Sequence, residues 1–331
     1  MASLRKVFKI LPDAEVSIEV DPRTATSKRL AHLCQFGFNR LSFGVQDFDE
    51  AVQVAVHRVQ PYEDVRDLMV SGRELGYKSI NVDLIYGLPK QTQESFSRTI
   101  EQVLQLRPDR IALYVYAHLP ERFKPQLRIL AQDLPDAATR IGLLNSAISG
   151  FIEGDYIYIG MDHFALPQDP LAQAKQQGKL HRNFQGYSTQ PDCDLIALGV
   201  SSIGRCSGVY SQNVKTLDAY YERLDARQFH VERRLALSTD DLIRQEIIME
   251  IMCQGCLNFA AIEQKHKLSM SDYFAQELEC LPPLVDLGLI VQESGVMQLT
   301  DFGWYFVRAV ALVFDRYLHN APTKAQYSRI V

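Results

Sequence analysis

Acidic and amide side chains lie at the ends of several apolar, strand-like segments of this sequence. Glu19 and Asp83 lie inside such segments, and Gln46 directly follows another. The carboxyl ends of parallel strands meet at one edge of a sheet, so these side chains would converge there and bind an ammonium group and ribose hydroxyls. The alternative for a single acidic residue is a solvent-facing strand position or a helix cap. Arg58 lies a little further along the chain. By itself it is expected to be a solvated surface arginine, unless it binds a ligand carboxylate.

Two dense polar runs follow further along the chain, at 160–165 and 181–187. The first contains Asp162 and His163. Such a pair is more often a hydrogen-bonded structural pair than a metal site, and no second histidine lies at zinc-site spacing. The second run offers donors that can hold carboxylates, beside a glycine that allows close approach: Arg182, Asn183, Gln185 and Tyr187. The alternative is a structural loop.

Several other motifs are absent or incomplete. The sequence has no P-loop and no Gly-x-Gly-x-x-Gly fingerprint, which argues against nucleotide hydrolysis and dinucleotide binding. The segment 199–203 misses the hydrolase nucleophile elbow because Ile203 stands where glycine is required. Cys253 and Cys256 form an isolated CxxC, which we interpret as structural.

Composition places further bounds on function. The chain has 331 residues, 47% of them hydrophobic and 23% charged, which is ordinary for a globular protein. The net charge of −5 argues against a nucleic-acid partner. No apolar run is long enough to span a bilayer and no signal-peptide pattern opens the chain, so we expect no membrane contact and a cytoplasmic location. Six dispersed cysteines fit a reducing compartment.

The elements that position these residues recur as helix followed by strand. Strands are expected at 16–20, 40–45, 80–86, 111–116, 156–161 and 195–200. They are mostly continuous apolar runs, as is typical of parallel strands buried on both faces. Helices between them predict an α/β fold, and the chemistry of such folds gathers at the carboxyl ends of the strands.

From about Leu235 the pattern changes. Helices are expected over 240–253 and 271–287, a hairpin over 289–299, and a last helix over 300–317 with Thr300 as its N-cap. This order predicts a mainly helical, winged-helix-like module. Its recognition helix would be the segment 271–287, which contains acidic residues but no lysine or arginine, so DNA binding is excluded on charge. The sequence therefore predicts domains at 1–234 and 235–331.

Six segments resemble the oxygen-independent coproporphyrinogen III oxidases, a radical S-adenosylmethionine family of haem biosynthesis. The resemblance extends from Val16 to the C-terminus, nearly the whole chain, and the segments that carry it are 17–22, 44–48, 81–92, 116–120, 160–165 and 181–187. The resemblance implies a partial, TIM-like (β/α) barrel of parallel strands with a C-terminal helical domain. By motif position it also implies S-adenosylmethionine contacts at Glu19, Gln46, Arg58, Asp83, Ala117 and Ile203.

The resemblance further implies a reaction. Two propionate side chains of coproporphyrinogen III become vinyl groups, each losing a hydrogen atom to a 5′-deoxyadenosyl radical and then carbon dioxide and one electron. An electron donor and an electron acceptor would take part, and the protein would be a monomer. The residues named above at 162–163 and 182–187 are the candidates for substrate contact.

The start of the chain departs from the family pattern. Members hold a [4Fe–4S] cluster on a C-x3-C-x2-C motif, and none of the six cysteines here has that spacing. We therefore expect no metal ligands in this chain and an N-terminally truncated form. The alternatives are a paralogue that binds haem or porphyrin without oxidising it and an inactive fragment.

Overall fold

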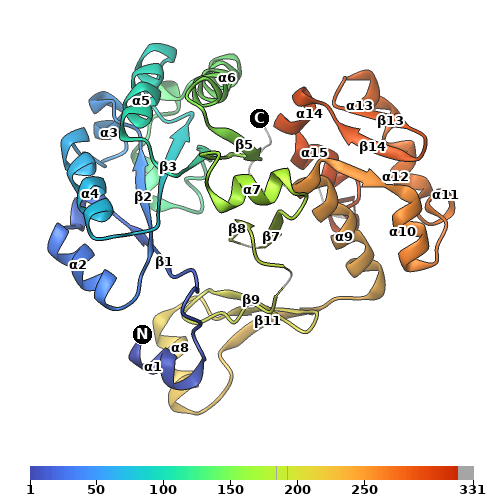
Figure 1. The fold of residues 1–331 in the computed structure, drawn as a ribbon, viewed down its shortest axis with the longest axis horizontal. Coiled ribbons are helices and arrows are strands. Elements are labelled where there is room, and N and C mark those ends of the chain that lie inside the picture. Colours follow the sequence, from blue (N-terminus) through green and yellow to red (C-terminus); the bar gives the residue numbers. More distant parts are fainter. Residues whose placement is uncertain (184, 192, 320–331) are drawn as a thin grey trace. The chain divides into compact units, whose positions relative to one another are not determined.

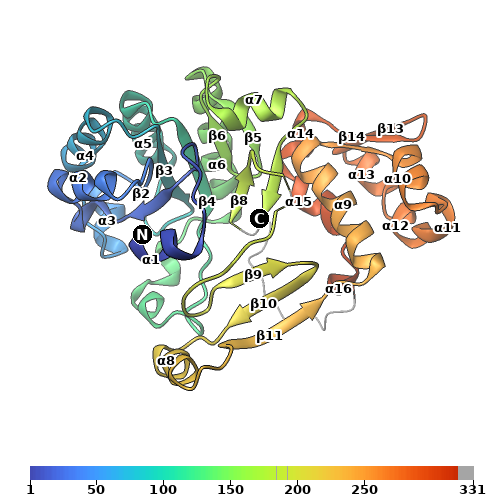
Figure 2. The same ribbon diagram turned by 60° about the horizontal axis from the view of Figure 1, so that its bottom comes forward.

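The computed structural model describes residues 1–183, 185–191 and 193–319 (Figures 1 and 2). By the contacts within it, the chain forms two compact units. Unit one is Met1–Ala172, and unit two runs from Gln173 to the end of the described chain. The sequence-based domain boundary at 234/235 stays a prediction.

Unit one is built on a six-stranded sheet in the order β1-β2-β3-β4-β6-β5. The four strands that pair in parallel are β1 (Ser17–Val20), β2 (Arg40–Gln46), β3 (Ser79–Tyr86) and β4 (Arg110–Val115). These confirm the first four expected strands and the parallel barrel-type sheet. The expected strand at 156–161 forms β5 (Ile157–Gly160), but it runs antiparallel to β6 (His163–Ala165). The reason is a tight turn in which Gly160 and Met161 have φ angles of 144° and 46°.

Helices cover one face of this sheet, as Figure 1 shows. They are α2 (Ser27–Gln35), α3 (Glu50–Ala55), α4 (Tyr62–Glu74), α5 (Gln93–Leu106) and α6 (Ala137–Glu153). The strand residues on that face are apolar and fully or nearly fully buried, among them Phe43, Val82 and Leu113. Alternate residues point to the other face, which carries polar and small side chains. The expectation of apolar runs on both faces is therefore wrong for β3, whose exposure alternates along its length.

Local capping explains where these helices begin and end. Thr92 caps α5 in a capping box with Ser95, and Arg107 ends that helix in the left-handed region, with φ at 46°. Asp136 accepts a hydrogen bond from the Thr139 backbone N–H at the start of α6. The remaining short elements of this part of the chain are α1 (Ala2–Val7), α7 (Pro170–Gln176), and the 3₁₀ turns Pro22–Thr24, Lys124–Arg128 and Ala131–Asp133.

Unit two contains a small antiparallel sheet, visible in Figure 2. Its strands are β9 (Ile203–Cys206), β10 (Val209–Asn213) and β11 (Val231–Ala236), and α8 (Leu217–Asp225) joins the last two. A separate hairpin pairs β7 (His181–Asn183) with β8 (Gly186–Ser188). The strand expected at 195–200 was wrong, because only Leu195 makes a bridge, to Arg205. Beyond it the chain turns at Gly199 and Ser201, which both have positive φ angles.

The C-terminal part of unit two combines helices with a hairpin. It begins with α9 (Thr239–Gln254), β12 (Cys256–Asn258) and α10 (Phe259–His266). The expected hairpin is confirmed as β13 (Ile290–Glu293) and β14 (Val296–Leu299), with β14 also paired to β12. This arrangement agrees with the expected winged-helix-like module.

Two expected long helices are divided. The segment 271–287 forms α11 (Met270–Tyr273), α12 (Ala275–Glu279) and α13 (Pro282–Asp286). Proline cannot continue a helix without losing a hydrogen bond, so a new helix begins at Pro282. The segment 300–317 forms α14 (Asp301–Tyr305), α15 (Val307–Leu312) and α16 (Arg316–His319), with a break at Phe306. Thr300 is confirmed as the N-cap of α14.

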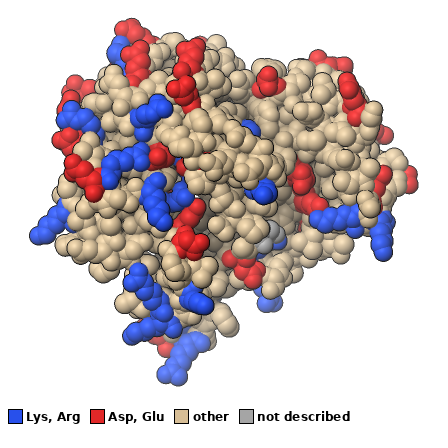
Figure 3. All heavy atoms as spheres, in the orientation of Figure 1, with Lys and Arg blue, Asp and Glu red and all other residues tan. Residues whose placement is uncertain are grey.

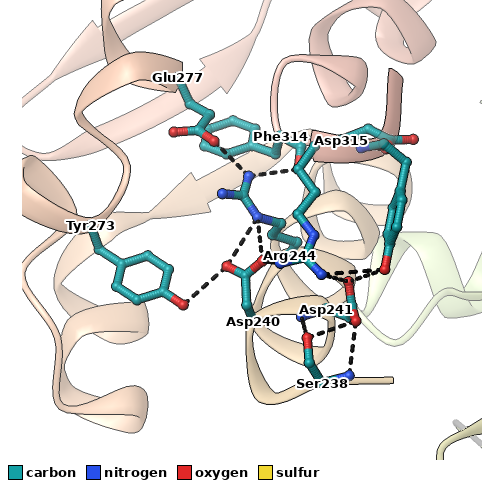
Figure 4. A network of polar contacts seen from close by, with 10 residues as sticks. Ser238, Asp240, Asp241, Arg244, Tyr273, Glu277, Phe314 and Asp315 are labelled. Atoms are coloured by element: carbon teal, nitrogen blue, oxygen red, sulfur yellow. Dashed lines mark hydrogen bonds and ion pairs between the residues drawn. The ribbon is translucent and has the colours of Figure 1, made fainter. Parts of the chain in front are cut away.

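A buried polar network joins these helices to α9 (Figure 4). The Arg244 guanidinium donates hydrogen bonds to Asp240 at 3.0 Å, to Glu277 at 2.6 Å and to the Phe314 carbonyl at 3.1 Å. Asp240 also accepts a hydrogen bond from the Tyr273 hydroxyl at 3.0 Å. One side chain therefore ties together α9, α12 and the chain after α15.

Candidate functional site

The polar face of the unit-one sheet brings the predicted residues into register. Glu19 on β1 pairs with Ser42 on β2, which pairs with Asn81 on β3. Two residues further along β3, Asp83 pairs with Gly44 on β2. Residues two apart on a strand point to the same face, so Glu19 and Asp83 share one face near the carboxyl ends of their strands.

The Asp83 carboxyl is held by two neutral donors. Asn81 Nδ2 donates to Asp83 Oδ1 at 2.8 Å, and the Ser42 hydroxyl donates to Asp83 Oδ2 at 3.2 Å. Burial and the nearby charge of Glu19 raise the pKa of Asp83 to about 6, against the opposing effect of these hydrogen bonds. Two carboxyl groups on one face, one with a raised pKa, form a site suited to a cationic ligand.

Gly44 allows two further polar side chains to converge on this face. A Cβ atom at Gly44 would lie 2.9 Å from Gln46 Nε2 and 3.0 Å from Arg58 Nη2, so a larger residue would displace the ends of both side chains. Arg58 Nη2 donates to the Gly44 carbonyl at 2.8 Å. Gln46 has a φ angle of 70°, at a register shift between β2 and β3. The irregular backbone at this strand end aims the Gln46 amide beside Arg58.

Arg58 retains unused hydrogen-bonding capacity. Its Nε atom is buried and has no hydrogen-bond partner among the described residues. Asp21 lies 3.5 Å from Nη2, and burial lowers the pKa of the guanidinium from its usual value. Arg58 therefore presents a charged donor to this site, of the kind that binds a carboxylate in two places.

A buried network of amide and carboxyl groups holds the loop after β2. The Asp47 carboxylate, which is 1% exposed, accepts hydrogen bonds from Gln91 Nε2 at 2.5 Å and from the Thr99 hydroxyl at 2.8 Å. Gln53 Nε2 donates to the carbonyls of Asp47 and Gln60, each at 2.9 Å. Because these contacts fix the backbone directly after Gln46, they position the Gln46 side chain.

The other predicted cofactor residues lie further apart in the chain. Ala117 follows β4, and its carbonyl accepts a hydrogen bond from Gln126 Nε2 at 3.0 Å. Ile203 opens β9 in unit two, where it pairs with Gln212. Unit one therefore brings together four of the six residues: Glu19, Gln46, Arg58 and Asp83.

Asp162 and His163 lie on the same sheet. His163 opens β6 and pairs with Ala112, which pairs with Asp83, so the small Ala112 separates two polar side chains on one face. The His163 ring meets Tyr114 edge-on at 6.0 Å. Asp162 lies in the turn before β6, where burial and its charge raise the pKa of Tyr86. Both residues face groups at the carboxyl end of β3 and β4.

The run at 182–187 forms the β7–β8 hairpin of unit two. The Arg182 guanidinium lies 4.9 Å from the centre of the Tyr187 ring. The Tyr187 hydroxyl donates to the Met252 carbonyl at 2.9 Å, and Asn183 Oδ1 accepts from the Gln185 backbone N–H at 2.9 Å. Tyr187 and Asn183 thus make structural contacts, whereas Arg182 has a buried Nη1 with no hydrogen-bond partner among the described residues.

Sequence reasoning missed the residues that support Asp83. Ser42 and Asn81 hold its carboxyl, and Gln60 donates to the Gly44 carbonyl at 3.4 Å. The signal for Asn81 was present, because Ser79, Asn81 and Asp83 alternate with apolar residues. Such alternation marks one polar face of a strand. Gln60 lies in a loop and has no such signal.

Comparisons with known proteins identify the family of the chain. Residues 1–103 match the model of the radical SAM superfamily, and residues 237–306 match that of the HemN C-terminal domain. The structure superposes on coproporphyrinogen III oxidase (HemN) from Escherichia coli, a radical SAM enzyme, with a TM-score of 0.92 at 45% identity, covering 95% of this chain and 72% of that one. The fold and site thus define a radical SAM enzyme.

Curated relatives narrow the class further. Oxygen-independent coproporphyrinogen III oxidases from Escherichia coli strain K12 and from Pseudomonas aeruginosa are 45% and 43% identical to this chain, over 100% of it and 72% of each relative. The chain belongs to the oxygen-independent coproporphyrinogen III oxidase family, whose members use S-adenosylmethionine and a [4Fe–4S] cluster. In the part of the chain that the structure describes, no helix is both long and apolar enough to cross a membrane.

Of the two cofactors, the residues present fit S-adenosylmethionine and do not fit the [4Fe–4S] cluster. S-adenosylmethionine carries positive charge and a carboxylate. The Glu19–Asp83 pair and the unsatisfied Nε atom of Arg58 complement these charges. The cluster is not fitted, because no three His, Cys, Asp or Glu side chains gather as a metal site among the described residues, and the sequence has no C-x3-C-x2-C spacing.

Proposed function

We propose that this chain carries the S-adenosylmethionine site and substrate site of an enzyme that converts coproporphyrinogen III to protoporphyrinogen IX. The observation that carries the proposal is the convergence of Glu19, Gln46, Arg58 and Asp83 around Gly44, in a chain 45% identical over its whole length to a named oxidase. When bound, S-adenosylmethionine supplies the 5′-deoxyadenosyl radical that removes hydrogen from a propionate.

Each site residue has a distinct task in this proposal. Glu19 and Asp83 accept hydrogen bonds from the amino group and ribose hydroxyls and attract the positive charge of the cofactor. Arg58 donates to its carboxylate, and Gln46 adds an amide beside it. Ala117 contributes backbone or apolar surface, and for Ile203 of unit two the same role is proposed from motif position alone.

The substrate candidates divide between the two units. Asp162 and His163 belong to unit one, and the hairpin residues Arg182, Asn183, Gln185 and Tyr187 belong to unit two. We propose each group, taken by itself, as a candidate for contact with coproporphyrinogen III. Arg182 is the residue among them whose unsatisfied donor matches a propionate.

Further features of the proposal follow from the chemistry of the reaction. Formation of each vinyl group releases carbon dioxide and one electron, so the enzyme requires an electron acceptor. Reductive cleavage of the cofactor requires an electron donor.

We propose a monomer in the cytoplasm, with domains at 1–234 and 235–331. On the face seen in Figure 3, acidic and basic side chains are interspersed over the helices of unit one, in keeping with a net charge of −5.

A second candidate function is favoured by one observation. Arg182 Nη1, a buried donor with no hydrogen-bond partner among the described residues, can hold a propionate without any oxidation, as in a porphyrin-binding paralogue that does not oxidise its ligand. In that case a tetrapyrrole binds, but no S-adenosylmethionine is cleaved.

A chimera distinguishes the two candidates. The segment of the Escherichia coli relative that precedes its aligned region is fused before Met1, and the product is reconstituted anaerobically with iron and sulfide. An oxidase forms 5′-deoxyadenosine and protoporphyrinogen IX when given reductant and coproporphyrinogen III. The same chimera carrying Asp83→Ala is the control and should lose both products. Porphyrin binding without 5′-deoxyadenosine in the parent chimera would support the paralogue instead.

A further inference from the structure

Unit two contains a cavity of about 500 Å³, lined by the β7–β8 hairpin, the chain that follows it, β9, α9 and α10. This volume lies within the range of small-molecule sites, about 300–1,000 Å³. Its walls carry an unusual density of charge for a cavity inside one folded unit. Charged side chains inside a cavity need partners, so the contacts of each group indicate what the cavity can bind.

Part of this charge is already neutralised within the protein. The Glu246 carboxylate on α9 accepts hydrogen bonds from Lys265 Nζ at 2.7 Å and from His266 Nε2 at 3.0 Å. These contacts lower the pKa of Glu246 against the effect of burial, which acts in the opposite direction. This wall of the cavity is a closed ion-pair cluster and offers little to a ligand.

Arg182 is in a different state. Its guanidinium is held over the Tyr187 ring, and that ring is fixed by the Tyr187 hydroxyl bond to the Met252 carbonyl. Arg182 Nη1 is nonetheless buried with no hydrogen-bond partner among the described residues. A buried charged donor left unsatisfied is costly, and a carboxylate in the cavity would remove that cost.

An acceptor lies near the same part of the cavity. Glu250, one turn after Glu246 on α9, makes no hydrogen bond or ion pair with the described residues. Burial raises the pKa of the Cys253 thiol to about 12, the charge of Arg182 lowers it, and the charge of Glu250 raises it further. Arg182, Glu250 and Cys253 all line the cavity, so its wall offers one charged donor and one acceptor.

We propose that this cavity binds one propionate-bearing pyrrole ring of a tetrapyrrole, with the propionate on Arg182 and the pyrrole N–H directed to Glu250. The inference rests on the proposed function and deepens it. A pyrrole ring carrying a propionate combines one anionic acceptor with one neutral donor, which matches the two residues. Coproporphyrinogen III has four propionates, of which two persist in the product, so the cavity anchors a propionate that does not react.

Fluorescence titration with coproporphyrin III, the stable aromatic form of the substrate, tests this on the chain as it exists. Arg182→Ala should weaken binding by about tenfold or more, and Arg182→Lys by less, because lysine keeps the charge but loses the planar fork. Arg233→Ala, an exposed arginine of β11 outside the cavity, is the matched control and should bind as the unaltered chain does. Thermal melting checks that each variant is folded.

A change in the ligand gives the same test without altering the protein. Coproporphyrin III tetramethyl ester has no carboxylate and should bind the unaltered chain about tenfold or more weakly, whereas protoporphyrin IX, with two propionates, should bind comparably to coproporphyrin III. Binding that is insensitive both to Arg182→Ala and to esterification would overturn the cavity assignment and leave the proposed function intact if the chimera is active. If the unaltered chain binds no coproporphyrin III while the chimera is active, the cavity assignment is also overturned.

Discussion

Glu19 and Asp83 share one face of the unit-one sheet, where burial of the Asp83 carboxyl and the charge of Glu19 raise the pKa of Asp83 to about 6. The neutral donors Asn81 and Ser42 hold the Asp83 carboxyl without cancelling this effect. Ionisation of two neighbouring carboxyl groups is unfavourable in the empty protein, and it becomes favourable once a cation binds between them. Their arrangement therefore suits a positively charged ligand, as the proposed cofactor site requires.

The first prediction concerns the pH dependence of cofactor binding. Asp83 is ionised above about pH 6 and neutral below it, so the affinity for S-adenosylmethionine should fall as the pH drops through 6. One coupled proton permits a fall of up to about tenfold per pH unit. Calorimetric titrations between pH 5 and 8 measure this slope. Asp83→Asn should flatten it, and an unchanged slope in that variant would assign the titration to another group.

The second prediction concerns stability. The folded-state pKa of Asp83 is raised above its ordinary value of 3.8, so protonation of Asp83 favours folding, and this contribution is lost as the pH rises from about 4 to about 6. At pH 7.5, Asp83→Asn should raise the free energy of unfolding by up to about 1–2 kcal/mol, after allowance for solvent screening. Urea denaturation at pH 7.5 and pH 4 measures both values. A variant less stable than the parent at pH 7.5 would contradict the pKa shift.

The third prediction concerns the close approach at Gly44. In Gly44→Ala the new methyl group would displace Gln46 Nε2 and Arg58 Nη2, which lie 2.9 and 3.0 Å from its position. Cofactor affinity should fall by about tenfold, the loss expected for one charge-assisted hydrogen bond. Gly142→Ala on α6 is the matched control, because its methyl group makes an equally close approach to a side-chain end, Gln93 Oε1 at 2.9 Å, that belongs to none of the proposed cofactor residues. Equal affinities in the two variants would show that Gly44 does not shape the pocket.

The fourth prediction concerns the Arg244 network of unit two, shown in Figure 4. Arg244→Met should lower the free energy of unfolding by about 2–4 kcal/mol, because it leaves Glu277 and Asp240 as half-paired or unpaired carboxylates in a largely buried place. Arg316→Ala removes a more exposed partner of Asp240 and should lower the free energy of unfolding by clearly less than Arg244→Met does. Similar losses in both variants would contradict the central place given to Arg244.

The sequence allowed much of the cofactor side of the site to be predicted. Glu19, Gln46 and Asp83 were located because polar residues interrupt apolar segments at strand ends, and strand ends of a parallel sheet share one edge. Ser42 was missed, since a serine within a strand has no chemical signal of its own. The convergence of Gln46 and Arg58 over Gly44 depends on a backbone irregularity at Gln46 that the sequence does not reveal.

The C-terminal half was less predictable. The segment 271–287 has a helical composition, but Pro282 and the turn at Phe274 divide it into three short helices. The apolar segment 195–200 has strand propensity, yet Gly199 turns the chain before a ladder can form. In both places a single backbone position outweighs the propensity of its neighbours, and tertiary packing decides the outcome.

Calorimetric titration of S-adenosylmethionine into the purified chain, with Arg58→Ala alongside, tests the central claim most directly. We predict one binding site in the unaltered chain and an affinity at least about tenfold lower in the variant, because Arg58 supplies the charged donor to the ligand carboxylate. Arg66→Ala, an exposed arginine on α4 of the same unit, should leave the affinity unchanged. Equal binding in all three proteins, or no binding heat in the unaltered chain, would contradict the assignment of the cofactor site to Glu19, Gln46, Arg58 and Asp83.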